Sequence, residues 1–206
     1  MVFHDVEQQT DQWFQLRCGH IGGSSIGKIM ANHGKAFGQP AHDLAVKIAI
    51  EQITGNPQES NYTNQHMERG HEQEPIARAL YEETFFCRVG NGGFYEDDIY
   101  GVSPDGRVDD DGLIEIKSVI YTVHYANIAR GSYDPSYKWQ LFLELKVSER
   151  EWIDFVSFCS TFPEGKRLYT FKLNREECDK EFGLIDERMG QFRELVSEKK
   201  RIIEDL

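Results

Sequence analysis

Apolar residues recur every three or four positions in several stretches of the chain, which is the spacing of an amphipathic helix. The first of these stretches ends at Gly55 and Pro57, residue types that stop helices. The second contains Pro75, which marks either a kink or a new first turn. The pattern therefore predicts helices over residues 41–54, 65–86 and 134–147, and one helix or a pair of helices over residues 175–206.

The pattern changes from Arg88 onward to short apolar runs, which are typical of strands. The sequence DDDG at residues 109–112 lies between two such runs and predicts a hairpin. Strands are predicted within residues 88–98, 99–120, 151–160 and 167–173. Helices before, between and after these strands indicate an α+β protein, in which helices flank a central mixed sheet.

Residues 11–31 combine an aromatic cluster with a glycine-rich turn. Ser24 and Ser25 precede the run IGKIMA, and serine is favoured at the position that caps a helix N-terminus. The sequence therefore predicts a helix that begins here with a serine cap. It does not distinguish between the two serines.

Length and composition fit one globular domain over residues 1–206, because 39% of the residues are hydrophobic and the chain is long enough to bury a core. The four cysteines form no CxxC pair, so neither a zinc site nor a disulfide scaffold is indicated. No apolar run approaches the roughly 20 residues that span a bilayer. The N-terminus has no secretory signal either. We therefore expect a cytoplasmic protein without membrane contact.

The net charge of −12 comes from 35 acidic and 23 basic residues. Such a balance argues against a basic module that coats DNA without specificity. It does not exclude an enzyme with a local basic channel, because net charge is an average over the surface. A third hypothesis is an acidic protein-interaction domain that binds no nucleic acid, but the net charge is the only feature that favours it.

The segment SPDGRVDDDGLIEIKS carries the candidate chemistry. Side chains alternate along a strand, so Glu115 and Lys117 would share one face while Ile116 points into the core. The hairpin would bring Asp105 close to Glu115. Two converging carboxylates form an all-oxygen site suited to magnesium or manganese. Beside it, Lys117 would orient or help to deprotonate an attacking water and neutralise developing charge.

A plainer interpretation of the same segment is a surface hairpin. Glu115 and Lys117 would then form an exposed ion pair that contributes well under ~1 kcal/mol to stability. A PD dipeptide followed at loose spacing by ExK is common by chance. The local pattern alone leaves both interpretations open.

Four blocks of the sequence resemble, in order, the PD-(D/E)xK nuclease superfamily and within it the phage lambda exonuclease family of YqaJ-type viral recombinases. They are WFQLRCGHIGGSS, ERGHEQEPIARALYEE, SPDG followed by LIEIK, and YKWQLFLEL. Together they run from Trp13 to about Leu145, some two-thirds of the chain. The resemblance implies a restriction-endonuclease-like fold, and four ordered blocks are far more specific than the core motif alone.

The resemblance also assigns an active site. The implied catalytic residues are Glu74, Asp105, Glu115, Lys117 and Gln140. Asp105, Glu115 and the main-chain carbonyl of Ile116 are the implied ligands of Mg²⁺, for which Mn²⁺ would substitute. Glu74 would serve a second metal ion. From the predicted long helix it could bring a third carboxylate towards the hairpin, and the alternative for it is a solvated helix glutamate.

A pocket for the 5′-phosphate of a DNA end is implied at Arg17, Ser24 and Ser103. Guanidinium and hydroxyl donors suit a phosphate. A member of the family has an arginine shortly after the ExK lysine as part of this pocket, and here that place falls near Val123 and His124. The resemblance therefore leaves three alternatives: His124 as a substitute in the pocket, Arg130 in its place, or a weaker pocket without strict dependence on a 5′-phosphate.

These assignments imply an exodeoxyribonuclease that degrades linear double-stranded DNA processively from 5′ to 3′ and leaves a 3′ single strand. The family forms ring-shaped homotrimers around DNA and acts with a single-strand annealing protein in phage recombination. A phage or prophage protein in the cytoplasm of a bacterial host is implied. The rival hypotheses are a structure- or sequence-specific endonuclease on the same fold, and a DNA-end-binding module without catalysis.

Overall fold

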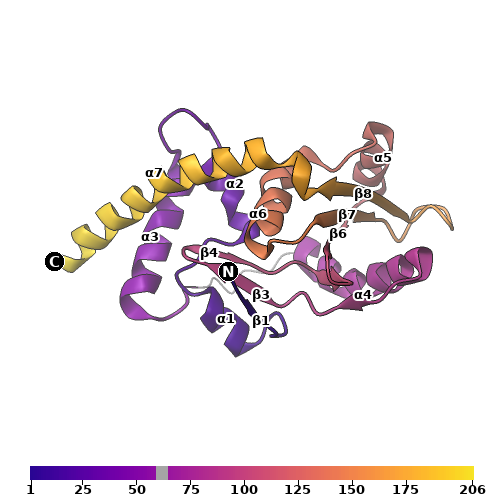
Figure 1. Cartoon of the computed structure of the whole chain (residues 1–206), viewed down its shortest axis with the longest axis horizontal. Coiled ribbons are helices and arrows are strands. Elements are labelled where there is room, and N and C mark those ends of the chain that lie inside the picture. The colour runs from indigo at the N-terminus through magenta and orange to yellow at the C-terminus, as the bar shows by residue number, and fades with distance from the viewer. Residues whose placement is uncertain (59–64) are drawn as a thin grey trace.

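Two sheets organise the fold in the computed structural model, which describes residues 1–58 and 65–206, with the backbone alone at 65–68 (Figure 1). The larger sheet consists of β2 (Val89–Gly90), β5 (Gly106–Val108), β6 (Gly112–Ser118), β7 (Trp152–Phe158) and β8 (Leu168–Asn174), in that order. β6 and β7 are parallel and the other neighbours are antiparallel. The predicted mixed sheet is therefore confirmed, and so is the hairpin between β5 and β6.

Helices surround the sheets on both sides. They are α1 (Asp11–Arg17), α2 (Gly23–Met30), α3 (Gln39–Thr54), α4 (Gln65–Phe85), α5 (Tyr121–Arg130), α6 (Lys138–Ser148) and α7 (Asp179–Glu204), with short 3-10 turns at Pro135–Tyr137 and Arg175–Glu177. The four predicted helices are confirmed as α3, α4, α6 and α7, and α4 continues through Pro75. Among the described residues, no helix has the length and apolar character needed to cross a bilayer.

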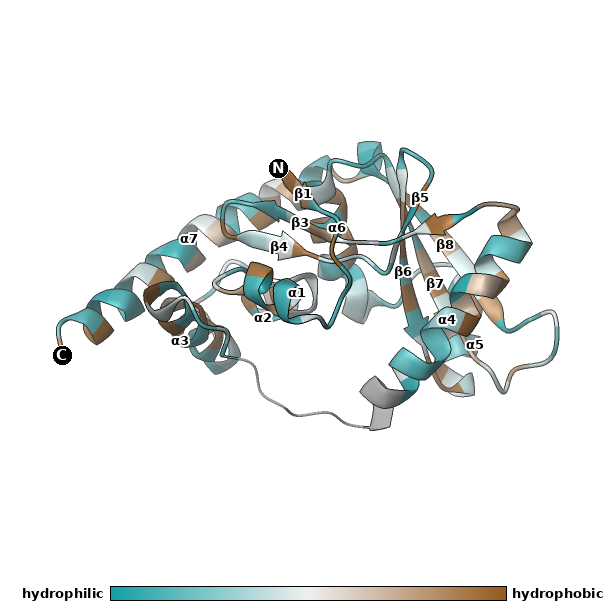
Figure 2. Cartoon of the chain, turned by 90° about the horizontal axis from the view of Figure 1, so that it is seen from below, coloured by the Kyte–Doolittle hydropathy of each residue, from teal (hydrophilic) through white to brown (hydrophobic). Residues whose placement is uncertain are grey.

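Both faces of the larger sheet are buried. On one face, Ile114 and Val156 pack against Tyr81 of α4. On the other, Ile153 and Phe155 join the main core, to which α6 and α7 contribute. Figure 1 accordingly shows α4 and α5 on opposite sides of this sheet, and Figure 2 shows hydrophobic residues along its strands. All residues of β7 after Trp152 are buried because helices cover both sides of the sheet.

A smaller sheet consists of β1 (Val2–His4), β3 (Phe94–Asp97) and β4 (Tyr100–Val102). The stretch predicted at residues 88–98 is divided between the two sheets, because β2 belongs to the larger sheet and β3 to the smaller one. The chain leaves the larger sheet after Gly90 and crosses at Gly92. A side chain at Gly92 would collide with the backbone of Pro104, because a Cβ would lie 1.8 Å from the Pro104 oxygen. The crossing therefore requires glycine and holds the loop before Asp105 in place.

The predicted serine cap is wrong. α2 begins at Gly23, and its capping residue is Gly22, whose backbone is extended and which offers no side-chain cap. Ser24 and Ser25 therefore lie inside the first turn. A Cβ at Gly23 would approach the Glu144 carboxylate of α6 to 2.9 Å, so α2 meets α6 at a glycine.

The helix α5 was not predicted. Its buried residues include the polar His124 and Asn127, whereas Tyr121 and Tyr125 are exposed. This inverts the usual distribution of apolar and polar positions, so the hydrophobic pattern does not reveal the helix. β1 also escaped prediction, because it has only three residues.

Candidate active site

A cleft of about 690 Å³ lies where β6, the start of α2, α4 and α6 meet. Every site residue predicted from the sequence except His124 lines it. Those residues are Arg17, Ser24, Glu74, Ser103, Asp105, Glu115, Ile116, Lys117 and Gln140. The structure therefore gathers residues from four sequence blocks into one cavity.

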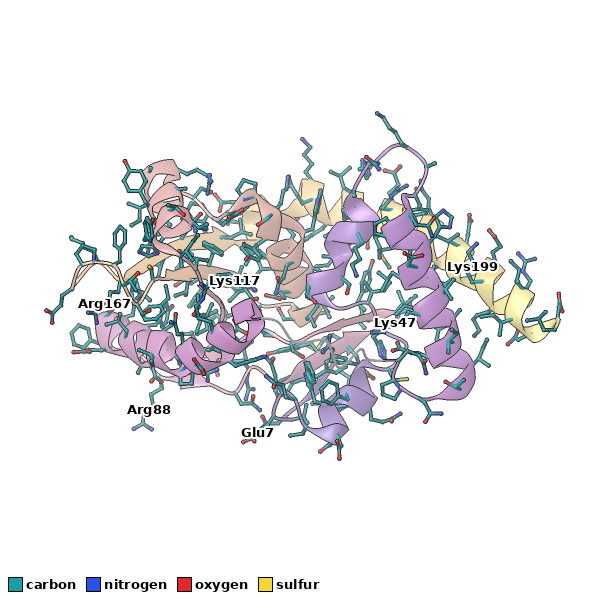
Figure 3. All side chains as sticks on the ribbon, turned by 180° about the vertical axis from the view of Figure 1, so that it is seen from behind. Glu7, Lys47, Arg88, Lys117, Arg167 and Lys199 are labelled. Carbon is teal, nitrogen blue, oxygen red and sulfur yellow. The ribbon has the colours of Figure 1, made fainter. Side chains whose placement is uncertain are left out.

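The strand β6 supplies the centre of this cleft. Glu115 and Lys117 lie on the same side of the strand, as predicted, and the Lys117 Nζ is 2.5 Å from the Glu115 Oε1. Glu115 is 2% exposed, so the surface ion pair considered above is not what the structure contains. Lys117 also lies over the ring of Tyr137 at 4.7 Å. Lys117 itself is one-fifth exposed, and Figure 3 shows Arg88 pointing away from the molecule on another side.

Asp105 is fixed against the same strand. It lies between β4 and β5, and its Oδ2 accepts a hydrogen bond from the backbone N–H of Ile116 at 2.6 Å. The predicted approach of Asp105 to β6 is therefore confirmed. The N–H and C=O groups of a strand residue point to the same side, so the Ile116 carbonyl also faces the side of Asp105.

The helix α6 presents Gln140 to this group. The Gln140 Nε2 donates to the Glu115 Oε1 at 2.5 Å and to the Glu144 Oε1 at 2.9 Å. Carboxylate oxygens accept hydrogen bonds and do not donate them when ionised, so the amide nitrogen and not its oxygen belongs between them. The side-chain amide of Gln140 thus bridges the carboxylates of Glu115 and Glu144 by donating one hydrogen bond to each.

Glu144 was missed by the sequence analysis. It is 1% exposed, lies one helical turn after Gln140 and lines the cleft. Its sequence signal is a single charge within the apolar run LFLEL, at a position four residues beyond a candidate site residue. A helix buries few unpaired glutamates, so this charge could have marked the site.

Glu74 reaches the cleft from α4. Its carboxylate lies 3.6 Å from the guanidinium of Arg78 and is about one-third exposed. Burial raises the pKa of Glu74, Arg78 lowers it, and the charge of Glu115 raises it further. The same Arg78 guanidinium donates a hydrogen bond to the backbone carbonyl of Asp105, so Arg78 links α4 to the loop that carries Asp105.

Negative charge accumulates in this cavity. Burial, and then the charge of Glu115, raise the pKa of Asp105 and of Glu144 well above the ordinary values. Burial by itself lowers the pKa of Lys117, but the charges of Glu115 and Asp105 outweigh it and leave this pKa above its usual value. The positive charge of Lys117 thus offsets part of the negative charge of several carboxylates in the cleft.

The donor set suits a hard divalent cation. Carboxylate and carbonyl oxygens are the ligands that Mg²⁺ and Mn²⁺ prefer. The Oε2 atoms of Glu115 and Glu144 are buried and have no hydrogen-bond partner among the described residues. Within those residues, no three Asp, Glu, His or Cys side chains are already grouped as a metal cluster. The chemistry of the site therefore fits a divalent cation.

A second group of residues also lines the cleft. The guanidinium of Arg17 lies over the ring of Trp13 at 4.0 Å, and the Trp13 Nε1 donates to the Ser103 Oγ at 2.7 Å. Ser24 is exposed in the first turn of α2. Arg17, Ser24 and Ser103 thus line one cavity, as a shared phosphate pocket requires.

The structure does not bring His124 to the cleft. His124 is fully buried, and its ring nitrogens contact the Ser157 Oγ at 2.9 Å and the Lys166 carbonyl at 3.0 Å. The preceding residue of α5, Val123, lines the cleft instead, because neighbouring helix residues point in different directions. Arg130 donates to Asn127 and to the Tyr133 carbonyl, and it does not line the cleft either.

Comparisons with known proteins agree with this arrangement. The YqaJ-like viral recombinase domain family matches residues 12–151. An alkaline exonuclease from Laribacter hongkongensis is 28% identical, with a TM-score of 0.82 over 95% of this chain and 97% of that one. Its structure with dAMP is similar at a TM-score of 0.78 over 95% of each chain.

A phage-related exonuclease from Haemophilus somnus 129PT shares the fold, with 17% identity, a TM-score of 0.64 and coverage of 90% of this chain and 96% of that one. No curated protein matches the sequence. The structural likenesses confirm the predicted exonuclease-type α+β fold.

Proposed function

This chain belongs to the YqaJ-like viral recombinase domain family, and from that premise we propose that it is a metal-dependent exodeoxyribonuclease. Family and structural likeness to an alkaline exonuclease support a nuclease. The observation that carries the proposal is the meeting of Asp105, Glu115 and Lys117 in one cleft with Gln140. The proposed substrate is linear double-stranded DNA, degraded processively from 5′ to 3′ so that a 3′ single strand remains.

Asp105, Glu115 and the Ile116 carbonyl would hold Mg²⁺, with Mn²⁺ as a substitute, and Glu74 would contribute to a second ion. When bound, the cation supplies a Lewis acid that polarises the scissile phosphate and favours ionisation of the attacking water. Among the described residues the Glu115 Oε2 has no hydrogen-bond partner, and this supports the assignment because a buried carboxylate oxygen without a partner is costly.

Lys117 and Gln140 act beside these ligands. The ammonium group of Lys117 has three donors, of which the Glu115 Oε1 takes one, and the others are available to an attacking water and a phosphate oxygen. Lys117 therefore orients the water and offsets the negative charge that develops on the phosphate. Gln140 holds the Glu115 carboxylate in position through its amide nitrogen.

The 5′ polarity is supported by the second group in the cleft. Arg17, Ser24 and Ser103 supply one cationic and two hydroxyl donors, which suit a terminal phosphate. The similar exonuclease has been determined with dAMP, a deoxynucleoside monophosphate, and a ligand of that class suits a cleft that is lined by both phosphate donors and carboxylates. His124 is not part of this proposal.

The net charge of −12 has to be reconciled with DNA as a partner. A homotrimeric ring with its basic residues around a central channel would achieve this, and the family resemblance supports such a ring. It also supports cooperation with a single-strand annealing protein, which would take up the 3′ strand that the nuclease exposes. Both remain proposals for this chain.

The proposed function is tested with end-labelled linear duplex DNA in the presence of Mg²⁺, compared as 5′-phosphate, 5′-hydroxyl and closed-circular forms. Wild type should degrade the linear 5′-phosphorylated form from its 5′ end and leave the circle intact. The variant Asp105→Asn should be inactive, whereas Asp110→Asn, in the exposed hairpin turn, should be fully active. Cleavage of the circle would establish the endonuclease rival instead, and binding of ends without any cleavage would establish the DNA-end-binding module.

A further inference from the structure

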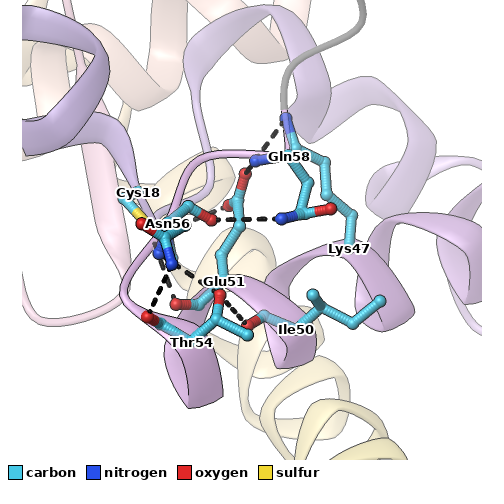
Figure 4. A network of polar contacts seen from close by, with 8 residues as sticks. Cys18, Lys47, Ile50, Glu51, Thr54, Asn56 and Gln58 are labelled. Atoms are coloured by element: carbon cyan, nitrogen blue, oxygen red, sulfur yellow. Dashed lines mark hydrogen bonds and ion pairs between the residues drawn. The ribbon is translucent and has the colours of Figure 1, made fainter. Parts of the chain in front are cut away.

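Buried carboxylates in this protein are of two kinds. Glu51 of α3 illustrates the first kind, because it accepts hydrogen bonds from the backbone nitrogens of Gly19 at 3.0 Å and Gln58 at 2.8 Å, and Lys47 lies 3.6 Å away (Figure 4). Its two oxygens therefore each have a donor. Such a glutamate ties a helix to its neighbouring loops, which is a structural role.

Asp154 of β7 is also of the first kind. Its Oδ2 accepts from the Tyr81 hydroxyl at 2.6 Å, and its Oδ1 lies 3.3 Å from the Lys172 Nζ. Both oxygens again have partners, in keeping with the rule that buried charges are paired or hydrogen-bonded. The protein thus satisfies its buried carboxylates outside the cleft.

Glu144 is of the second kind. Its Oε1 accepts one hydrogen bond, from Gln140, and its Oε2 is buried without a partner among the described residues. Glu115 accepts from the same Gln140 amide, and its Oε2 is likewise without a partner in the part of the chain that the structure describes. Two carboxylates joined by one amide thus each keep one oxygen unsatisfied, and both line the same cleft.

The start of α2 offers only part of an explanation. Its N-terminus packs against Glu144 at Gly23, and the positive end of a helix dipole stabilises a nearby carboxylate. That contact is with the Oε1, which already accepts from Gln140. Among the described residues it leaves the Oε2 without a donor, so this oxygen is available to a ligand.

We propose that Glu144 belongs to the cation-binding site, where its carboxylate, held in place by Gln140, supplies a further oxygen donor for Mg²⁺ or Mn²⁺. This inference rests on the proposed function, because it assumes that a cation binds between Asp105 and Glu115. It adds a residue from α6 to the donors from β6 and from the loop before β5.

The test is Mn²⁺ binding to the free protein without DNA, measured by electron paramagnetic resonance, together with the melting temperature with and without Mn²⁺. Glu144→Gln should weaken Mn²⁺ binding by at least about tenfold and reduce the Mn²⁺-dependent rise in melting temperature. Without Mn²⁺ it should melt at or above the wild-type temperature, because it removes a buried, half-satisfied charge. Glu144→Met, of similar size and uncharged, should reproduce the loss of binding.

Glu51→Gln is the matched control, a buried helix glutamate outside the cleft. It should lower the melting temperature without Mn²⁺ and bind Mn²⁺ like wild type. If Glu144→Gln also melts lower and still binds Mn²⁺ like wild type, Glu144 is structural and the inference is overturned while the proposed function stands. If wild type binds no Mn²⁺, the cation requirement of the proposed function fails, and the role of Glu144 fails with it.

Discussion

The indole nitrogen of Trp13 donates a hydrogen bond to the Ser103 hydroxyl oxygen at 2.7 Å and so ties α1 to the loop after β4. The face of the same indole carries the guanidinium of Arg17 at 4.0 Å. One buried side chain thus orients two of the three groups proposed to bind a 5′-phosphate. Because the Ser103 oxygen accepts from Trp13, its hydroxyl hydrogen remains to be donated to a phosphate.

Trp13→Phe should lower the preference for 5′-phosphorylated over 5′-hydroxyl DNA ends by about two- to tenfold, because a neutral hydrogen bond contributes roughly 0.5–1.5 kcal/mol. The phenyl ring keeps a surface beneath Arg17, so the loss reflects the orientation of Ser103. Initial rates on the two substrates measure the effect. Trp152→Phe, at the far end of β7, is the control and should keep the wild-type preference. An equal loss of rate on both substrates would show that Trp13 only supports the fold.

Arg17→Ala should reduce the same preference more strongly, by about 10- to 100-fold, since each hydrogen bond to a charged group contributes roughly 1.5–3 kcal/mol. It should also shorten processive runs. The requirement for a metal ion should be unchanged, because Arg17 is not one of the proposed metal ligands. Arg88→Ala, on an outward-pointing side chain, is the control (Figure 3). If wild type does not distinguish the two ends, the phosphate pocket is disproved although the nuclease assignment can stand.

The fold was predictable where the buried face of an element is apolar. The helix α3 repeats small and branched apolar residues and ends at Gly55 in the left-handed conformation, so its pattern and its stop signal agree. The helix α5 buries His124 and Asn127 instead, and polar burial is determined by partners elsewhere in the chain. The division of residues 88–98 between two sheets likewise depends on the contact of Gly92 with Pro104, which local pattern does not contain.

The site shows the same limit. Asp105, Glu115 and Lys117 were predictable because one hairpin and strand alternation bring them together. Glu144 was missed, since a helix glutamate is ordinarily solvated, although its isolation within the apolar run LFLEL is a sequence signal of the burial that the packing of α6 against α2 produces. His124 was assigned from its distance along the chain to the ExK lysine, but α5 turns it away from the cleft.

Lys117→Ala should lower the turnover number by at least about 10²–10³-fold, the usual effect of removing one group that stabilises transition-state charge. DNA binding, measured by fluorescence anisotropy in the presence of Ca²⁺, should remain close to wild type. Lys199→Ala on α7, far from the cleft, should be fully active (Figure 3). A parallel fall of binding and turnover in Lys117→Ala would instead identify Lys117 as a phosphate anchor.

Asp105→Asn should abolish Mg²⁺-dependent cleavage without lowering the melting temperature measured in a chelator at pH 7. Burial and the charge of Glu115 raise the pKa of Asp105, so its ionised form disfavours the folded state at this pH. The neutral amide removes that repulsion, and its oxygen can still accept from the Ile116 N–H. A strongly lowered melting temperature would mean that Asp105 is needed for the fold, and near-native cleavage would refute the site assignment.

The burial of His124 predicts a pH-dependent stability that is independent of catalysis. Burial lowers the pKa of His124 below its ordinary value of 6.5, so the folded state favours the neutral ring. Its contribution to the free energy of unfolding is therefore fully present above pH 6.5 and is lost as the pH falls below that value towards the lowered pKa. In urea unfolding between pH 7.5 and pH 5, His124→Gln should lose less stability on acidification than wild type, whereas His33→Gln, on a partly exposed turn, should follow wild type. The preference for 5′-phosphorylated ends should be unchanged in His124→Gln because His124 does not line the cleft. A reduced preference with an unchanged pH profile would return His124 to the phosphate pocket.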